Sequence, residues 1–138
     1  MRLSVSILNS KDKINMIKTL NNTKISYIHM DVMDGLFVSQ KSLPSDEIIK
    51  LSPFSSKSLD IHLMVENPMY YIERIKELSN IDNITIHLEI NKDIKNILNK
   101  IKEYGFKRIE DIKNVSGIKD AAFNKIKDYI CVWTRSNY

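Results

Sequence analysis

The chain has 138 residues, 43% of them hydrophobic, which is enough for one domain with a buried core but well short of the roughly 250 residues of a complete eight-stranded α/β barrel. Its formal net charge is only +4, and its three glycines exclude the glycine-rich phosphate loops of P-loop and dinucleotide-binding enzymes. One cysteine excludes an intrachain disulfide and, with no signal peptide or apolar run long enough to span a bilayer, favours a cytoplasmic protein.

Strand-like and helix-like segments alternate from the start of the chain. In chain order, the patterns predict strand 3–8, helix 11–20, strand 25–31, helix 45–51, strand 59–64, helix 69–78, strand 83–88 and helix 93–104. In the first helix, Ile14 and Ile17 are expected to face inward, together with either Met16 or Leu20. Four successive β-α units imply parallel strands joined by right-handed crossovers.

Each predicted strand has one apolar and one polar face. Because side chains alternate along a strand, the second to fourth strands share an apolar face of Ile28, Met30, Val32, Leu59, Ile61, Leu63, Ile84, Ile86 and Leu88. The opposite face carries Tyr27, His29, Asp31, Asp60, His62, Thr85, His87 and Glu89, and on the first strand Ser4 and Ser6. A doubly wound sheet would be apolar on both faces. The pattern instead favours α/β architecture of the partial TIM (β/α) barrel type, with about four βα units and a site at the carboxyl ends of the strands.

Three polar residues, His29, Asp31 and His62, stand where hydrophobic residues are the norm in a strand. Two imidazoles and a carboxylate on neighbouring strands are the donors of a metal site or a proton-transfer site. The alternative is a set of interior polar groups that hydrogen-bond to one another. We expect His87 to be such a partnered interior histidine, although it and Glu89 could be recruited to a metal.

Two aspartates near this cluster have structural interpretations. Asp34 is expected to fix a turn with Gly35 rather than to take part in chemistry. Asp60 could orient His62 or another neighbour, or accept hydrogen bonds from backbone N–H groups. Neither residue is therefore assigned a direct role in the site.

Three segments carry a pattern that is matched in order and in spacing: residues 6–10 (SILNS), 29–38 (HMDVMDGLFV) and 59–68 (LDIHLMVENP). Over roughly residues 1–106 the chain resembles the ribulose-phosphate 3-epimerase family. This resemblance implies a TIM-barrel isomerase of the pentose phosphate pathway. Such an enzyme converts D-ribulose 5-phosphate to D-xylulose 5-phosphate through an enediolate, by metal-assisted proton abstraction.

The resemblance also implies roles for individual residues. A divalent metal (Zn, Fe, Mn or Co) would be held by His29, Asp31 and His62, and Asp31 would act as the catalytic acid/base. The expected substrate-binding residues are Ser6, His62, Met33 and Met64. In the family, a second acid comes from a seventh strand and the phosphate binds after strands six to eight. Where the family usually has Pro-Asn after Phe-Val, this chain has Ser39-Gln40, which alters that loop.

Residues 107–138 depart from the family pattern and are expected to form a helical tail after a half barrel of residues 1–106. Residues 106–130 resemble a degenerate helix-hairpin-helix unit of the competence DNA-receptor type. The hairpin would be Gly117-Ile118-Lys119, in which the second glycine is replaced. Gly117 and Lys119 are then the expected phosphate or DNA contacts, whereas the alternative is that the basic residues form a solvated helix face.

Together these features predict an epimerase-like isomerase that acts on a pentulose phosphate, truncated after four βα units and impaired in activity. Four strands leave two open sheet edges, so a homo-oligomer could complete the barrel. The alternative function is a noncatalytic DNA-binding or scaffold protein that uses the basic tail. A further alternative is the product of a disrupted gene without a selected function.

Overall fold

The computed structural model describes residues 2–90 and 93–105. Its elements are β1 (Ser4–Ser6), α1 (Lys13–Asn21), β2 (Tyr27–Asp34), β3 (Lys41–Ser42), α2 (Ser45–Leu51), the 3-10 helix η1 (Ser52–Phe54), β4 (Ser58–Met64), α3 (Pro68–Ile75), β5 (Ile81–Ile86) and α4 (Ile94–Glu103). All eight predicted elements are present, with ends shifted by a few residues. The predicted tail, including Gly117 and Lys119, lies outside the described residues, and DNA contact there stays a prediction. None of the helices described is long and apolar enough to cross a bilayer.

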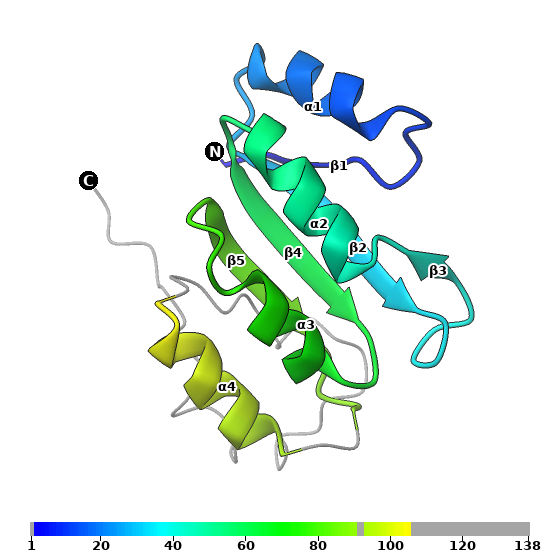
Figure 1. Ribbon diagram of the computed structural model, residues 1–138, viewed down its shortest axis with the longest axis vertical. Helices are drawn as coiled ribbons and strands as arrows, with labels where there is room; N and C mark the ends of the chain where they lie inside the picture. Colours follow the sequence, from blue (N-terminus) through cyan, green and yellow to red (C-terminus); the bar gives the residue numbers. More distant parts are fainter. Residues whose placement is uncertain (1, 91–92, 106–138) are drawn as a thin grey trace.

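The strands β1, β2, β4 and β5 form a parallel sheet in that order (Figure 1). Each of these strands therefore lies beside the preceding one in the chain, which is the arrangement of a partial (β/α) barrel. The remaining strand, β3, pairs antiparallel with the end of β2 and was not predicted. Its two residues are too few to show an alternating pattern.

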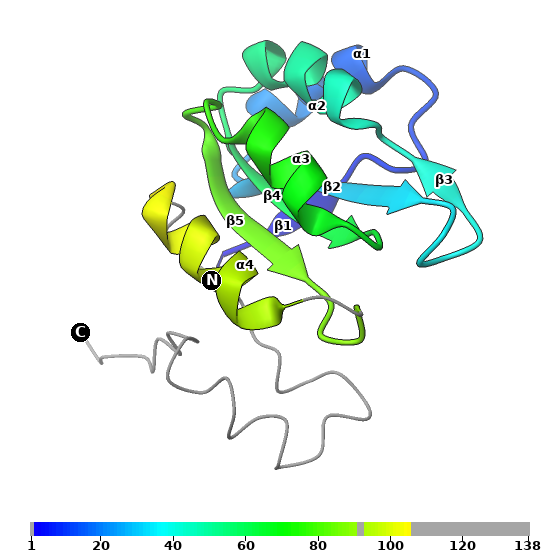
Figure 2. The same ribbon diagram turned by 60° about the horizontal axis from the view of Figure 1, so that its bottom comes forward.

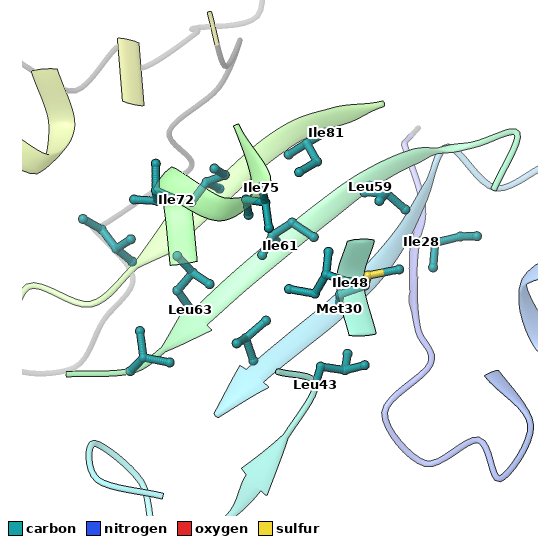
Figure 3. Close-up of a cluster of buried hydrophobic side chains, with 14 of the residues drawn as sticks. Ile28, Met30, Leu43, Ile48, Leu59, Ile61, Leu63, Ile72, Ile75 and Ile81 are labelled. Atoms are coloured by element: carbon teal, nitrogen blue, oxygen red, sulfur yellow. The ribbon is translucent and has the colours of Figure 1, made fainter. Parts of the chain in front are cut away.

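The helices cover one face of the sheet (Figures 1 and 2), and the apolar side chains of the strands pack in one core cluster with side chains of the helices. Ile28, Ile61 and Leu63 are fully buried, as the alternation predicts. They pack in one cluster with side chains from α2 and α3, including Ile48 and Ile72 (Figure 3). This hydrophobic layer fixes the sheet from one side and leaves its other face free to carry polar residues.

Two residues that were predicted to be buried in the core are not. In α1, Ile17 and Leu20 are buried as expected, but Ile14 is 38% exposed. The helix lies at one end of the row of helices in the described part of the chain (Figure 1), so it has a neighbouring helix on one side only. Leu88 was expected on the apolar face of a strand, but β5 ends at Ile86 and Leu88 is only half-buried beyond it.

A bulge shifts the pairing of β5 against β4. Leu59 pairs with Ile81, whereas the next residue, Asp60, pairs with Asn83, so Asp82 is the extra residue. Such a bulge changes which side chains follow in register. Its consequence here is that Ile81, two residues before Asn83, pairs with Leu59 of the apolar face, whereas Asn83 pairs with Asp60 of the polar face.

Candidate metal centre

Asp31 lies at the centre of the polar face. The register of β2 and β4 pairs His29 with Asp60 and Asp31 with His62, so these four side chains share that face. Asp31 Oδ1 lies 3.1 Å from His29 Nε2 and 3.3 Å from His62 Nδ1. The other oxygen, Oδ2, accepts a hydrogen bond from Ser6 Oγ at 2.9 Å. One carboxylate oxygen is thus held by β1 while the other faces both imidazoles.

His29 is oriented from its outer side by Asp60. His29 Nδ1 lies 2.7 Å from Asp60 Oδ2, and the same oxygen accepts a hydrogen bond from Ser4 Oγ at 2.9 Å. The hydrogen bond with Asp60 raises the pKa of His29 above its ordinary value, although burial works in the opposite direction. Burial alone would raise the pKa of Asp60, but its contacts with His29 lower it. Of the roles left open for Asp60, the structure therefore shows that it orients a neighbour, and that this neighbour is His29.

His62 meets a second histidine on its outer side. His62 Nε2 lies 2.8 Å from His87 Nε2. Burial, and then the proximity of His87, lower the pKa of His62 below its ordinary value. His87 is part-buried and partnered, as predicted for an interior histidine, and its Nδ1 lies 3.6 Å from Glu89 Oε2.

The three predicted ligands can hold a metal ion. The ligand atoms of His29, Asp31 and His62 all lie within 4.8 Å of one another, and in the described part of the chain no other group of three such side chains does so. Two imidazole nitrogens and one carboxylate oxygen suit zinc, iron, cobalt or manganese, and three protein ligands leave coordination positions open. Because Asp60 and His87 engage the outer nitrogens, the inner nitrogens are turned toward Asp31, so the donor set fits a metal.

The remaining predicted site residues surround this cluster. Met33 and Met64 are register partners on the same face, two residues beyond the Asp31 and His62 pair toward the carboxyl ends of the strands. Met33 is buried and Met64 is half-buried. Ser6 lies on the predicted face, where its hydroxyl donates to Asp31 and accepts from the Leu8 backbone N–H. The structure thus brings all the predicted barrel-site residues to one face.

Asp34 holds the loop at the end of β2, as predicted. Its Oδ1 accepts hydrogen bonds from the backbone N–H groups of Leu36 and Phe37, and its Oδ2 accepts one from Glu66. Gly35 has a φ of +78°, the left-handed region that favours glycine. Asp34 is therefore a turn residue at the rim of the site.

Asn83 is a polar residue that the sequence analysis did not single out. It is 2% exposed and is the register partner of Asp60. Its side-chain oxygen has no hydrogen-bond partner in the structure described. Alternation from Ile84 and Ile86 places Asn83 on the polar face with Thr85 and His87, and the register of β5 against β4 puts it beside Asp60. Its burial depends on the side chains that pack around it, which the sequence of a single strand does not specify.

Comparison with known proteins identifies the family. A model of the ribulose-phosphate 3 epimerase family matches residues 2–123. The chain belongs to this family. Ribulose-phosphate 3-epimerase of Chlamydia pneumoniae is 34% identical over 88 residues, which are 64% of this chain and 38% of the relative. The ribulose-phosphate 3-epimerase of Helicobacter pylori strain J99 is 32% identical over 106 residues, 76% of this chain and 48% of the relative.

A third member, the ribulose-phosphate 3-epimerase of Synechocystis, is 33% identical over 93 residues, 66% of this chain and 40% of the relative. The matched part of this chain therefore spans less than half the length of each of these three epimerases. Membership of the ribulose-phosphate 3-epimerase family confirms the resemblance inferred from residues 6–10, 29–38 and 59–68.

Proposed function

We propose that this chain takes part in the 3-epimerisation of a pentulose phosphate, D-ribulose 5-phosphate to D-xylulose 5-phosphate, with Asp31 as an acid/base group. The observation that carries this proposal is the position of Asp31 Oδ1, 3.1 Å from His29 Nε2 and 3.3 Å from His62 Nδ1. Family membership and the names of the relatives support the reaction and the substrate.

The chemistry requires a base and a means of stabilising negative charge. Inverting a carbon next to a ketone begins with removal of a weakly acidic proton, which leaves charge on the carbonyl oxygen. A divalent metal held by His29, Asp31 and His62 would supply the positive charge that stabilises this oxygen. The Asp31 carboxylate takes the proton, and Ser6 fixes the plane of that carboxylate through Oδ2. Epimerisation also needs a second acid on the opposite side of the carbon, so Asp31 accounts for one of the two proton transfers.

Exchange with deuterated solvent tests the Asp31 step by itself. With Zn²⁺, Mn²⁺ or Fe²⁺ added, the chain is incubated in D₂O with ribulose 5-phosphate and, separately, with xylulose 5-phosphate. We expect deuterium at carbon 3 of one of the two sugars, and we expect Asp31→Asn to abolish this exchange.

The matched control is Asp46→Asn, because Asp46 is an exposed residue of α2 that pairs with Arg74 on the helical side of the sheet. It should leave exchange unchanged. Exchange that survives in Asp31→Asn, or its absence from both sugars in the unsubstituted chain, would contradict the proposal. A coupled epimerase assay on the same samples measures the complete reaction, which depends on the second acid as well.

We also propose that copies of the chain associate through the sheet. In residues 2–90 and 93–105, β1 pairs only with β2, and β5 pairs only with β4. Strands with one free edge pair readily with another chain, and association would also cover the polar face. Light scattering coupled to size exclusion should give the mass of a dimer or larger oligomer, and a monomer at all concentrations would refute the association.

A further inference from the structure

Two histidines of the polar face meet nitrogen to nitrogen. His62 Nε2 and His87 Nε2 lie 2.8 Å apart. The two ring centroids are 5.0 Å apart with an interplanar angle of 21°. Because the centroids are nearly twice as far apart as the nitrogens, the rings meet edge to edge and nearly in one plane. This is hydrogen-bond geometry, so a proton lies between the two nitrogens.

The direction of that hydrogen bond depends on what His62 does at its other nitrogen. A neutral imidazole has one N–H donor and one acceptor nitrogen. A His62 ring that gives its Nδ1 lone pair to a metal must carry its proton on Nε2, which then donates to His87 Nε2. His87 must in turn carry its own proton on Nδ1, the nitrogen that lies 3.6 Å from Glu89 Oε2.

We propose that His87 is a positioning residue, which accepts a hydrogen bond from His62 Nε2–H and thereby commits His62 to bind the metal through Nδ1. This inference rests on the metal site of the proposed function and extends it to a residue outside the group of His29, Asp31 and His62. His29 is held in the same manner by the Asp60 carboxylate, so the two metal-binding histidines have different outer partners. His87 also has a ring contact with Phe37, at 4.9 Å between centroids, which is separate from its hydrogen bond with His62.

Two substitutions at position 87 separate the hydrogen bond from the packing. His87→Gln keeps an acceptor oxygen, whereas His87→Phe keeps a flat ring but removes the acceptor. Zn²⁺ affinity is measured by competition with a chromogenic chelator, without any sugar. We expect His87→Phe to weaken Zn²⁺ binding about 10- to 100-fold, the usual effect of losing an outer partner of a ligand, and His87→Gln to stay within about threefold. Phe37→Leu, which removes the ring contact but keeps the acceptor, should also bind Zn²⁺ normally.

The proton positions are measured directly by long-range ¹H–¹⁵N spectra of the Zn²⁺-loaded, unsubstituted chain. We expect His62 protonated on Nε2, and His87 protonated on Nδ1 and not on Nε2. This measurement decides the question even where His87→Phe fails to fold. A proton on His87 Nε2 in the loaded chain, or equal losses of affinity in His87→Phe, His87→Gln and Phe37→Leu, would overturn the inference. Wild-type affinity in His87→Phe overturns only the role of His87, whereas no Zn²⁺ binding by the unsubstituted chain overturns the metal site as well.

Discussion

Removal of the Asp60 carboxylate is expected to weaken metal binding although Asp60 is not itself a ligand. Asp60 Oδ2 accepts hydrogen bonds from His29 at 2.7 Å and from Ser4 at 2.9 Å. A hydrogen bond to a charged group contributes about 1.5–3 kcal/mol, which corresponds to about 10- to 150-fold in affinity. Because the His29 side chain is 25% exposed and water screens part of this interaction, we expect Asp60→Ala to weaken Zn²⁺ binding about 10- to 30-fold.

Isothermal titration with Zn²⁺ measures this loss, and two further variants define its origin. Asp60→Asn keeps an acceptor without the charge and should fall between Asp60→Ala and the unsubstituted chain. Ser4→Ala leaves the His29 contact in place and should lose only about two- to fivefold. The matched control Asp46→Ala removes an exposed carboxylate from the helical side and should not change affinity. Affinity within about twofold of the unsubstituted value in Asp60→Ala would refute the idea that the outer partner of His29 matters.

Three other predictions concern stability. Ile61→Ala empties a fully buried position and should lower the free energy of unfolding in urea by about 2–5 kcal/mol, whereas Ile49→Ala, at a position 37% exposed, should cost less than about 1 kcal/mol. Gly35→Ala should lower the melting temperature more than Gly105→Ala, although both glycines have φ near +80°. Only the added Cβ at Gly35 meets other atoms, 2.8 Å from Lys41 Cγ near the base of that side chain, and equal losses would contradict this steric argument. Burial opposes ionisation of Asp34, but its backbone hydrogen bonds hold its pKa below the ordinary 3.8, so its contribution is present above that pH and is lost as the pH falls below it. Asp34→Asn should therefore be less stable than the unsubstituted chain at neutral pH, with a difference that shrinks in acid and that urea unfolding at several pH values measures.

The order of elements was predictable because successive strands and helices differ clearly in period. The alternation along β2 and β4 also identifies both faces of the sheet, since Ile28 and Ile61 are buried and His29 and His62 share the opposite face. The burial of side chains in α1, at the edge of the layer of helices, was not predictable. The exposure of Ile14 depends on which neighbours lie beyond α1, and helical spacing within one segment contains no such information.

The three metal ligands were predictable as a group, but their outer partners were not. The sequence places Asp60 on the same face as His29 and His62, and only the register of β2 against β4 decides that its partner is His29. The contact between His62 and His87 depends similarly on the pairing of β5, which contains a bulge. Contacts across strands are set by register, and the sequence of a single strand does not specify register.

Because β2 and β4 carry the hydrophobic layer on one face and the metal centre on the other, substitutions and deletions in these strands have different effects. A substitution at one position alters either the hydrophobic layer or the metal centre, so each can change while the other is conserved. Deletion of a single residue of β4 before His62 would alter both faces at once, because every later side chain of the strand would exchange sides. His62 would then turn toward the helices and Leu63 toward Asp31. Within these strands, variation in residue type is tolerated separately on each face. Variation in length is not, and we expect insertions and deletions to be confined to the connections between elements.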